Sequence, residues 1–251
     1  MTGTIKSIAI FVLLTMATAT FSMENACVAQ SGAAVTPVIE LYTSEGCSSC
    51  PPADRWLSSL KNQNAGQGAV IEAFHVGYWD NLGWVDRFAS PAYTLRQRQI
   101  AAWTGQGSIY TPQVVRNGKD WRGWGAPGTY PTAASGAAHF SIAMKESGPD
   151  QFEAIVTPGA GAPALWGAYW TVTESGYNSK VKAGENTGAF LQDDFVVRQY
   201  TPVGEYHTGA VSPQVLTLRS IADSPGHARH INLVLFDPKT GVTLQAVSAG
   251  C

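Results

Sequence analysis

The sequence predicts an α/β domain followed by a β-rich, sandwich-like domain. Across residues 36–136, apolar strand-like runs alternate with runs of helical period. Across residues 137–251, short alternating runs follow one another, with turn residues between them and no helical period. A stretch rich in Gly, Pro and Ala, residues 118–136, separates the two patterns and marks the expected domain boundary.

The first half begins with a strand, a helix and a second strand. Residues 38–42 are the first apolar run, and residues 69–76 are the second. The second run is apolar almost throughout, as is typical of a strand that is covered on both faces. Between the runs, apolar side chains recur at i, i+3, i+4 and i+7 from Ala53 to Leu60, which predicts a helix with one face on a sheet.

A second helix and a strand with a tight turn complete this half. Ser90 is a favoured N-cap and Pro91 is favoured at the first helical position, so we expect a helix from there to about Trp103. Residues 111–119 have the pattern of a strand and a tight turn. The resulting order, βα–β–α–ββ, is that of a thioredoxin-type α/β sheet.

The second half contains only strand candidates. Their apolar residues alternate with polar ones, which is typical of strands with one buried face. The candidates are residues 140–144, 152–156, 166–172, 195–200, 215–219, 230–236 and 242–247.

The N-terminus predicts export. Lys6 precedes an uncharged, apolar run over residues 7–21, a pattern typical of a signal peptide and short for a transmembrane helix. Small residues at 17–19 and at 27–29 offer two cleavage sites, so we assign residues 1–29 to the signal peptide and leave the site open. An uncleaved membrane anchor is the alternative. No second apolar stretch approaches spanning length, so we expect a periplasmic or secreted mature chain without a membrane span.

Charge and composition exclude two classes of partner. The chain has 16 Lys and Arg residues against 18 Asp and Glu residues, and none of these charges form long runs. Such a balance gives no electrostatic attraction for nucleic acid or anionic lipid. Eight tryptophans and a charged fraction of 14% fit a compact, secreted, β-rich protein.

The motif Cys47-Ser48-Ser49-Cys50 carries the clearest chemical signal. It lies between the first strand and the first helix, where the positive end of the helix stabilises a thiolate. We expect Cys47 to be the more exposed, attacking sulfur and Cys50 to resolve the mixed disulfide. The alternatives are a permanent structural disulfide and a copper or zinc site that uses both thiolates. In an exported chain Cys27 and Cys251 pair only if cleavage precedes Cys27.

Two further residues are expected to serve the dithiol as catalytic residues. Pro112 lies in the loop before the strand that begins at Gln113 and should lie beside residues 38–42, so we expect Thr111-Pro112 to be cis and to face the cysteines. A proline that merely starts a strand is the alternative. Glu40 lies on the strand that leads to the dithiol, and a buried carboxylate there could carry the proton of Cys50. A solvent-facing Glu40 is equally compatible with the pattern.

Neighbouring side chains are candidates for substrate or metal binding. Thr111, Tyr110 and Trp79 are expected to border the dithiol as a substrate-binding surface, although core packing also explains such aromatic residues. His75 ends the second strand and is the third ligand in the alternative copper site with Cys47 and Cys50; a structural histidine is the other interpretation. The leading hypothesis contains no metal and no cofactor.

Several motifs follow one another in order along residues 38–119. They are Glu40-Leu-Tyr-Thr-Ser-Glu-Gly-Cys-Ser-Ser-Cys-Pro-Pro-Ala-Asp54, His75-Val-Gly-Tyr-Trp-Asp80, Gly83-Trp84, Phe88-Ala-Ser-Pro-Ala92, Arg96-Gln-Arg-Gln99 and Tyr110-Thr-Pro-Gln-Val114. Together they resemble the secreted bacterial family of domain of unknown function 1223, in the thioredoxin-like superfamily. In the second half, Gly184-Glu-Asn-Thr-Gly188 resembles the same family more weakly.

The resemblance implies a thioredoxin-like fold with a β-rich C-terminal region, and it brings no established activity. Gly77 stands where we expect an aspartate in relatives, which implies weakened or altered chemistry if that acid serves the site. The sequence as a whole thus predicts an exported thiol–disulfide oxidoreductase that acts on protein thiols or disulfides or on a redox partner protein. The alternatives are a periplasmic copper-handling protein and a binding module with a structural disulfide.

Overall fold

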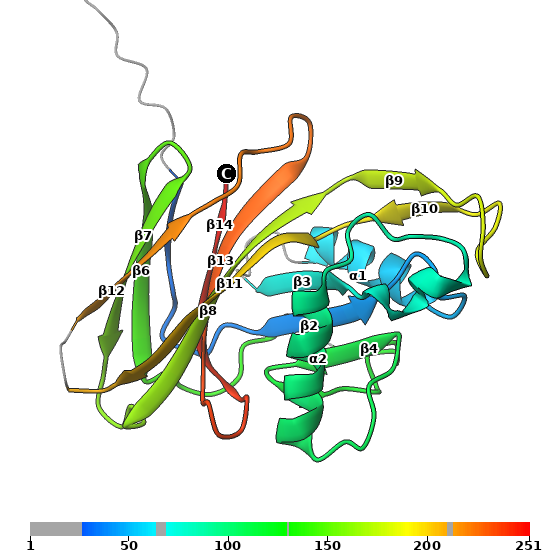
Figure 1. The fold of residues 1–251 in the computed structure, drawn as a ribbon. Coiled ribbons are helices and arrows are strands. Elements are labelled where there is room, and N and C mark those ends of the chain that lie inside the picture. The colour runs from blue at the N-terminus through cyan, green and yellow to red at the C-terminus, as the bar shows by residue number, and fades with distance from the viewer. Residues whose placement is uncertain (1–26, 64–68, 130, 210–212) are drawn as a thin grey trace, which may run out of the picture.

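The computed structural model describes residues 27–63, 69–129, 131–209 and 213–251, so most of the expected signal peptide lies outside the described residues. Strands dominate the described chain (Figure 1). The helices are α1 (Pro51–Gln63), the 3-10 helix η1 (Gly77–Leu82) and α2 (Pro91–Thr104). The strands are β1 (Val28–Gln30), β2 (Val38–Thr43), β3 (Val70–His75), β4 (Gln113–Arg116), β5 (Lys119–Asp120), β6 (Phe140–Gly148), β7 (Gln151–Pro158), β8 (Leu165–Ser175), β9 (Tyr177–Lys180), β10 (Phe190–Asp193), β11 (Val196–His207), β12 (Gln214–Arg219), β13 (Ala228–Phe236) and β14 (Thr243–Gly250).

One eight-stranded mixed sheet runs through the molecule, in the order β14-β13-β8-β11-β3-β2-β4-β5. Strands β2 and β3 are parallel, and β4 pairs antiparallel with β2. The junction between the two halves of the sequence is the parallel pairing of β11 with β3, where Val196 lies opposite Ala73. The Ala73 amide donates to the Phe195 carbonyl oxygen at 2.8 Å.

The predicted fold class is therefore wrong. The structure is mostly β, and the strands that we expected to form a separate helix-flanked, thioredoxin-like α/β sheet are part of a large mixed sheet shared with β8, β11, β13 and β14. The local pattern of residues 195–200 identified a strand correctly, but it carried no information about its partner 120 residues away. Long-range pairing of this kind depends on packing that a local pattern does not encode.

The two halves of the sequence also pack directly against each other. Trp103 of α2 donates its indole N–H to the Pro238 carbonyl oxygen at 3.0 Å. Gly118, which has a φ of 78°, lies so close to Gly241 that a Cβ at this position would clash with its backbone. The turn after β4 is thus fitted to the turn between β13 and β14.

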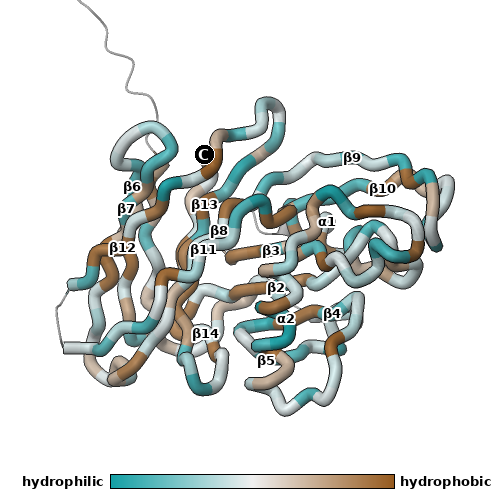
Figure 2. The backbone as a smooth tube through the Cα atoms, viewed as in Figure 1, coloured by the Kyte–Doolittle hydropathy of each residue, from teal (hydrophilic) through white to brown (hydrophobic). Residues whose placement is uncertain are grey.

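A second sheet, in the order β1-β6-β7-β12, covers one end of the large sheet. Side chains from β6, β7 and β12 meet side chains from β8, β13 and β14 in one apolar core. Trp166 and Trp170 lie fully buried at its centre. Figure 2 shows apolar segments on strands of both sheets, so burial of the two facing surfaces stabilises this part of the chain.

Each long helix packs on a different face of β2. Leu57 and Leu60 of α1 contact Ile39 and Leu41, as the helical period predicts. On the other face, α2 packs against Tyr42 and Phe74. The predicted start of α2 is confirmed, since the Ser90 hydroxyl accepts from the Ala92 amide and Pro91 follows it. Successive β2 side chains therefore face different helices.

Strands β9 and β10 form a separate hairpin that the sequence pattern did not predict. It follows β8 through Gly176, which has a φ of 88°, and leads back into β11. The hairpin extends from the large sheet over the side that carries α1 (Figure 1). Its base is joined to α1 by an ion pair between Lys61 and Asp194, with 2.5 Å between nitrogen and oxygen.

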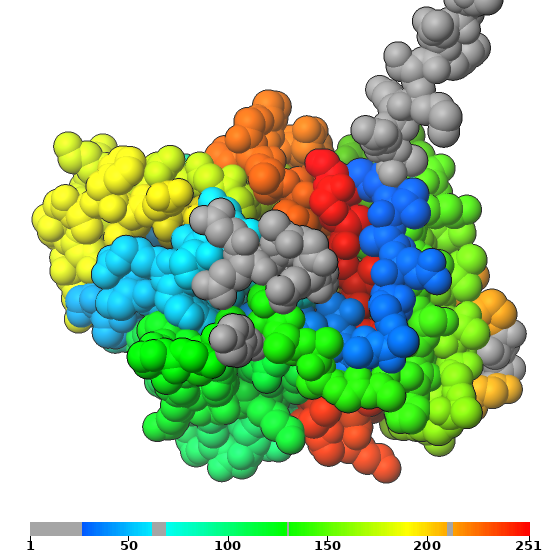
Figure 3. Space-filling model, turned by 180° about the vertical axis from the view of Figure 1, so that it is seen from behind, coloured from blue at the N-terminus to red at the C-terminus, as the bar shows by residue number. Residues whose placement is uncertain are grey.

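A disulfide links the two ends of the described chain. Cys27 is bonded to Cys251, with 5.4 Å between their Cα atoms. This pairing answers the question that the cysteine count left open. Figure 3 shows the N-terminal described segment, which contains β1, beside the C-terminal strand. Within the described residues, none of the helices has the length and apolar character needed to cross a membrane.

Candidate functional site

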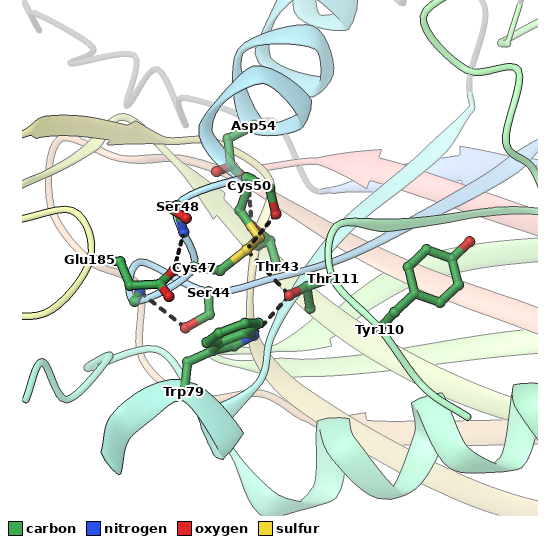
Figure 4. Close-up of a disulfide and its surroundings, with 12 residues drawn as sticks. Thr43, Ser44, Cys47, Ser48, Cys50, Asp54, Trp79, Tyr110, Thr111 and Glu185 are labelled. Atoms are coloured by element: carbon green, nitrogen blue, oxygen red, sulfur yellow. Dashed lines mark hydrogen bonds between the residues drawn. A yellow bond between two sulfur atoms is a disulfide. The ribbon is translucent and has the colours of Figure 1, made fainter. Parts of the chain in front are cut away.

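The Cys47–Cys50 disulfide lies in the loop that joins β2 to α1 (Figure 4). Two consecutive turns shape this loop, because the Cys47 amide donates to the Ser44 carbonyl and the Cys50 amide donates to the Cys47 carbonyl. The Asp54 amide then donates to the Cys50 carbonyl at 3.1 Å and begins α1. Pro51 occupies the first helical position, where a missing N–H removes no helical hydrogen bond. Both sulfurs are thus held at the helix N-terminus.

Neither cysteine reaches solvent. Cys47 and Cys50 are both 0% exposed, whereas Ser48 and Ser49 between them are exposed. The expectation that Cys47 is the more exposed sulfur is wrong. The motif alone could not show this, because contacts to the sulfur come partly from distant residues such as Thr111.

A chain of hydrogen bonds ends on the Cys47 sulfur. The Trp79 indole N–H donates to Thr111 Oγ1 at 2.8 Å, and the Thr111 hydroxyl donates to Cys47 Sγ at 3.3 Å (Figure 4). Because the Thr111 oxygen accepts from Trp79, its own proton is directed at the sulfur. Ser49 Oγ lies 3.4 Å from the same sulfur. Hydroxyl donors stabilise a thiolate more than a thiol, so the surroundings favour charge on Cys47.

The structure brings Pro112 to the disulfide as predicted. The Thr111-Pro112 peptide bond is cis, which confirms that expectation, and Thr111 immediately before it contacts Cys47. Trp79 and Thr111, both predicted to bind substrate, are joined to each other and to the sulfur.

Tyr110 is not brought to the sulfurs. Its hydroxyl donates to Asp120 at 2.7 Å, and its ring points away from the disulfide (Figure 4).

Glu40 also lies away from the disulfide. Its side chain is on the α2 face of β2, where Arg96 donates to both carboxylate oxygens at 2.9 and 3.0 Å. The Tyr42 hydroxyl donates to the same carboxylate at 2.7 Å. The cysteines precede α1, on the opposite face of the strand. The carboxylate is therefore fully engaged in a buried ion pair, and the geometry does not favour a proton-carrying role for it.

His75 lies on the α1 face, paired with Asp86. Its Nδ1 is 2.7 Å from Asp86 Oδ2, and both side chains are buried. Burial lowers the pKa of His75, but the charge and hydrogen bond of Asp86 and the charges of Asp193 and Asp54 outweigh it and raise the pKa to about 9. A protonated imidazole offers no lone pair to copper. Among the described residues, no three His, Cys, Asp or Glu side chains are grouped as a metal site.

Two carboxyl groups on the side of the sheet that carries α1 have pKa values far above their usual range. Burial raises the pKa of Asp54 to about 6, although the Thr43 hydroxyl donates to it at 2.7 Å. Burial raises the pKa of Asp193 to about 7, against the opposing charge of His75. Sequence reasoning overlooked both residues. The position of Asp54 was a usable signal, because four residues after Cys50 is the same face of the helix, one turn on.

The loop between β9 and β10 reaches back to the cysteines. Glu185 accepts a hydrogen bond from the Ser48 amide at 3.0 Å (Figure 4). The Asn186 side-chain amide donates to the carbonyl oxygens of Glu45 and Cys47, both at 2.9 Å. These two residues belong to the Gly184–Gly188 motif noted in the sequence, for which no role was predicted.

Comparisons with known proteins place this site in a family context. No curated protein matches the sequence. The chain is similar in structure to protein AGR_C_4864 from Agrobacterium tumefaciens, with 24% identity, a TM-score of 0.66 and coverage of 86% of this chain and 94% of that one. It is also similar to HBP35 of Porphyromonas gingivalis, with 12% identity, a TM-score of 0.53 and coverage of 87% and 76%. Both likenesses concern the fold alone. The family model described as "Protein of unknown function (DUF1223)" matches residues 38–235, and the chain therefore belongs to that family.

Proposed function

We propose that this protein is an exported thiol–disulfide oxidoreductase whose reactive pair is Cys47 and Cys50. The observation that carries the proposal is the hydrogen-bonded chain from Trp79 through Thr111 to the Cys47 sulfur. A disulfide with a purely structural role needs no hydrogen-bond donor at one of its sulfurs. A sulfur that acts as nucleophile or leaving group needs such a donor, because its thiolate must be stabilised.

Position along the chain assigns the two sulfurs different roles. Cys47 has hydroxyl neighbours in Thr111 and Ser49 and is the sulfur that exchanges with a client. Cys50 is fixed at the first turn of α1, with its Cα 5.4 Å from that of Cys47, and closes or opens the internal disulfide. The helix N-terminus adds a partial positive charge that favours a thiolate.

The exchange conserves atoms and electrons. A client thiolate attacks Cys47 Sγ, the Cys47–Cys50 bond breaks, a mixed disulfide forms, and Cys50 leaves as a thiolate that takes up a proton. A second client thiolate then attacks the client sulfur of the mixed disulfide and releases Cys47. The net result is a client disulfide and a reduced Cys47–Cys50 pair, with two electrons transferred. The same steps in reverse reduce a client disulfide.

Export fits the covalent structure. The chain has two disulfides, and structural disulfides form and persist mainly in oxidising compartments such as the periplasm or the exterior. The Cys27–Cys251 bond requires a mature chain that keeps Cys27, which favours signal-peptide cleavage near residues 17–19 over cleavage after residue 29.

Trapping of the intermediate tests the proposal. In cells that express Cys50→Ala, Cys47 has no internal partner, so covalent mixed disulfides with client or reductase proteins should accumulate. They should release their partners on reduction. A Cys47→Ala variant is the matched control and should trap far less. Absence of mixed disulfides from Cys50→Ala, with the protein folded and Cys47 alkylatable, would contradict the proposal.

A further inference from the structure

We propose that the loop Gly184–Gly188 is a cover over the Cys47–Cys50 disulfide and must lift before a client reaches Cys47. The inference rests on the proposed function for its purpose, because a buried disulfide can exchange only after exposure. It explains two facts together: both cysteines are 0% exposed, and a loop about 140 residues away in sequence is bonded to the backbone around them.

The cover is held by the side chains of Glu185 and Asn186. Glu185 accepts from the Ser48 amide, and Asn186 bridges the carbonyl oxygens of Glu45 and Cys47. These three bonds join the β9–β10 loop to both ends of the turn that contains Cys47. Asn186 is the latch, since its one amide group donates to two carbonyl oxygens of the cysteine loop.

Hydrogen bonds within the loop allow it to move as a unit. Its stem is closed by Val181 and Ala189, because the Val181 amide donates to the Ala189 carbonyl at 3.0 Å. Its tip is folded on itself by a bond from the Thr187 amide to the Gly184 carbonyl at 3.3 Å. Gly184 and Gly188, with φ values of 76° and 86°, flank the two latching residues. Lifting the tip therefore breaks the three latch bonds and leaves the internal bonds of the loop intact.

The groups released on opening suit an extended peptide. They are one N–H donor, on Ser48, and two carbonyl acceptors, on Glu45 and Cys47. A client main chain carries both kinds of group and can replace the latch bonds when it docks beside Cys47. The cover thus restricts exchange to partners that make these bonds, and it shields the disulfide from small thiols.

The rate of disulfide reduction by dithiothreitol in the folded protein tests the cover. Dithiothreitol is oxidised to its cyclic disulfide as the Cys47–Cys50 bond is reduced, and alkylation with mass spectrometry follows that pair alone. Asn186→Ala removes two hydrogen bonds and should raise the rate about tenfold or more. Asn186→Asp, which places a carboxylate against two carbonyl oxygens, should raise it further. Glu185→Gln should give a smaller increase.

Asn178→Ala is the matched control, because Asn178 is an exposed asparagine of the same hairpin without a bond to the cysteine loop. It should leave the rate within about twofold of the wild type. Urea unfolding separates local opening from global instability: the rate increase should exceed any rise in the unfolded fraction, and exchange of the Ser48 amide proton should accelerate in parallel.

Equal reduction rates in wild type, Asn186→Ala and Asn186→Asp would overturn the cover, as would rates that rise only with the unfolded fraction. The outcome is separate from that of the trapping experiment. Faster reduction without trapped clients would keep the cover and reject the oxidoreductase, whereas trapped clients with unchanged reduction rates would do the reverse.

Discussion

The two faces of β2 and β3 both bury carboxylates, but they neutralise them in different ways. On the α2 face, Arg96 pairs with Glu40, and the Tyr169 and Thr171 hydroxyls donate to both oxygens of Glu72. On the α1 face, beside the disulfide, His75 is paired with Asp86, while two further carboxyls, Asp54 and Asp193, have pKa values raised to about 6 and 7.

The hydrogen bonding of the buried carboxylates differs between the two faces. On the α2 face every carboxylate oxygen of Glu40 and Glu72 has a donor. On the α1 face one oxygen of Asp193 and one of Glu45 are buried without a hydrogen-bond partner. Groups that titrate near neutral pH next to a potential nucleophile are typical of functional sites. Burial and the charge of Glu40 also raise the pKa of Glu72 on the α2 face, to about 8. Position near the cysteines, rather than a raised pKa alone, therefore makes Asp54 the candidate for proton chemistry.

The largest expected effect follows from removing the cation of the structural face. Arg96→Met leaves Glu40 buried without its partner and should lower the free energy of unfolding by about 3–5 kcal/mol. Urea unfolding measures it, and Arg98→Met, an exposed arginine of the same helix, should change it by less than about 0.5 kcal/mol. Equal effects of the two substitutions would refute the structural role of this face.

The next largest effect is a pH dependence of the free energy of unfolding, which arises from His75 on the α1 face. The pKa of His75 is raised from 6.5 to about 9, so its contribution to stability is complete below pH 6.5 and is lost as the pH rises through 9. The loss should amount to about 3 kcal/mol between these values. Urea unfolding at pH 6.5 and pH 9.5 measures it. His75→Gln should remove most of this slope, whereas His207→Gln, at an exposed position, should keep it.

Asp54→Asn tests where the proton of Cys50 goes. The carboxyl of Asp54 lies one helical turn from Cys50 and has a pKa of about 6, so it is suited to accept or return that proton near neutral pH. The exchange rate should fall about tenfold, and its pH profile should lose the step near pH 6. Glu40→Gln, measured on the folded fraction, should leave both unchanged. A larger loss of rate from Glu40→Gln would restore the role that the sequence assigned to Glu40.

The smallest effect concerns the donor on Cys47. Thr111→Val removes the hydroxyl that stabilises the thiolate, so alkylation of Cys47 in the reduced protein at pH 7 should slow several-fold, by about 3–10 times. Thr111→Ser keeps a hydroxyl and should stay near the wild-type rate. Equal rates in the valine and wild-type proteins would show that the contact of Thr111 with the sulfur does not influence its charge.

Local patterns predicted the individual elements well and their assembly poorly. The Ser90–Pro91 start of α2, the apolar stripe of α1 and most of the strands follow from side-chain periodicity and capping, which act within a few residues. The pairing of β11 with β3 depends on contacts across more than 100 residues, and so the fold class was wrong. Strands β9 and β10 are short, and their alternation was missed.

For the site too, local features were predicted from the sequence and long-range contacts were not. Cys47, Cys50 and the cis bond before Pro112 could be predicted, because the motif and the order of elements bring them together. Burial of the sulfurs could not, since it depends on residues distant in sequence, such as Thr111, which lies 64 residues from Cys47 and contacts its sulfur. The face of β2 on which Glu40 lies was also misjudged, although local side-chain alternation determines it. Ile39 and Leu41 point toward α1, so Glu40 between them points to the other face of the strand, toward α2.

The reduction potential of the Cys47–Cys50 pair distinguishes an exchange-active disulfide from a structural one. The folded protein is equilibrated in thiol–disulfide buffers of graded potential, then alkylated, and mass spectrometry follows each cysteine pair separately. An exchange-active pair should be reduced reversibly at potentials above about −300 mV, with the protein folded and the Cys27–Cys251 bond intact. Reduction of Cys47–Cys50 only below about −300 mV, or only together with unfolding, would show that this disulfide is a structural link and not a reactive pair.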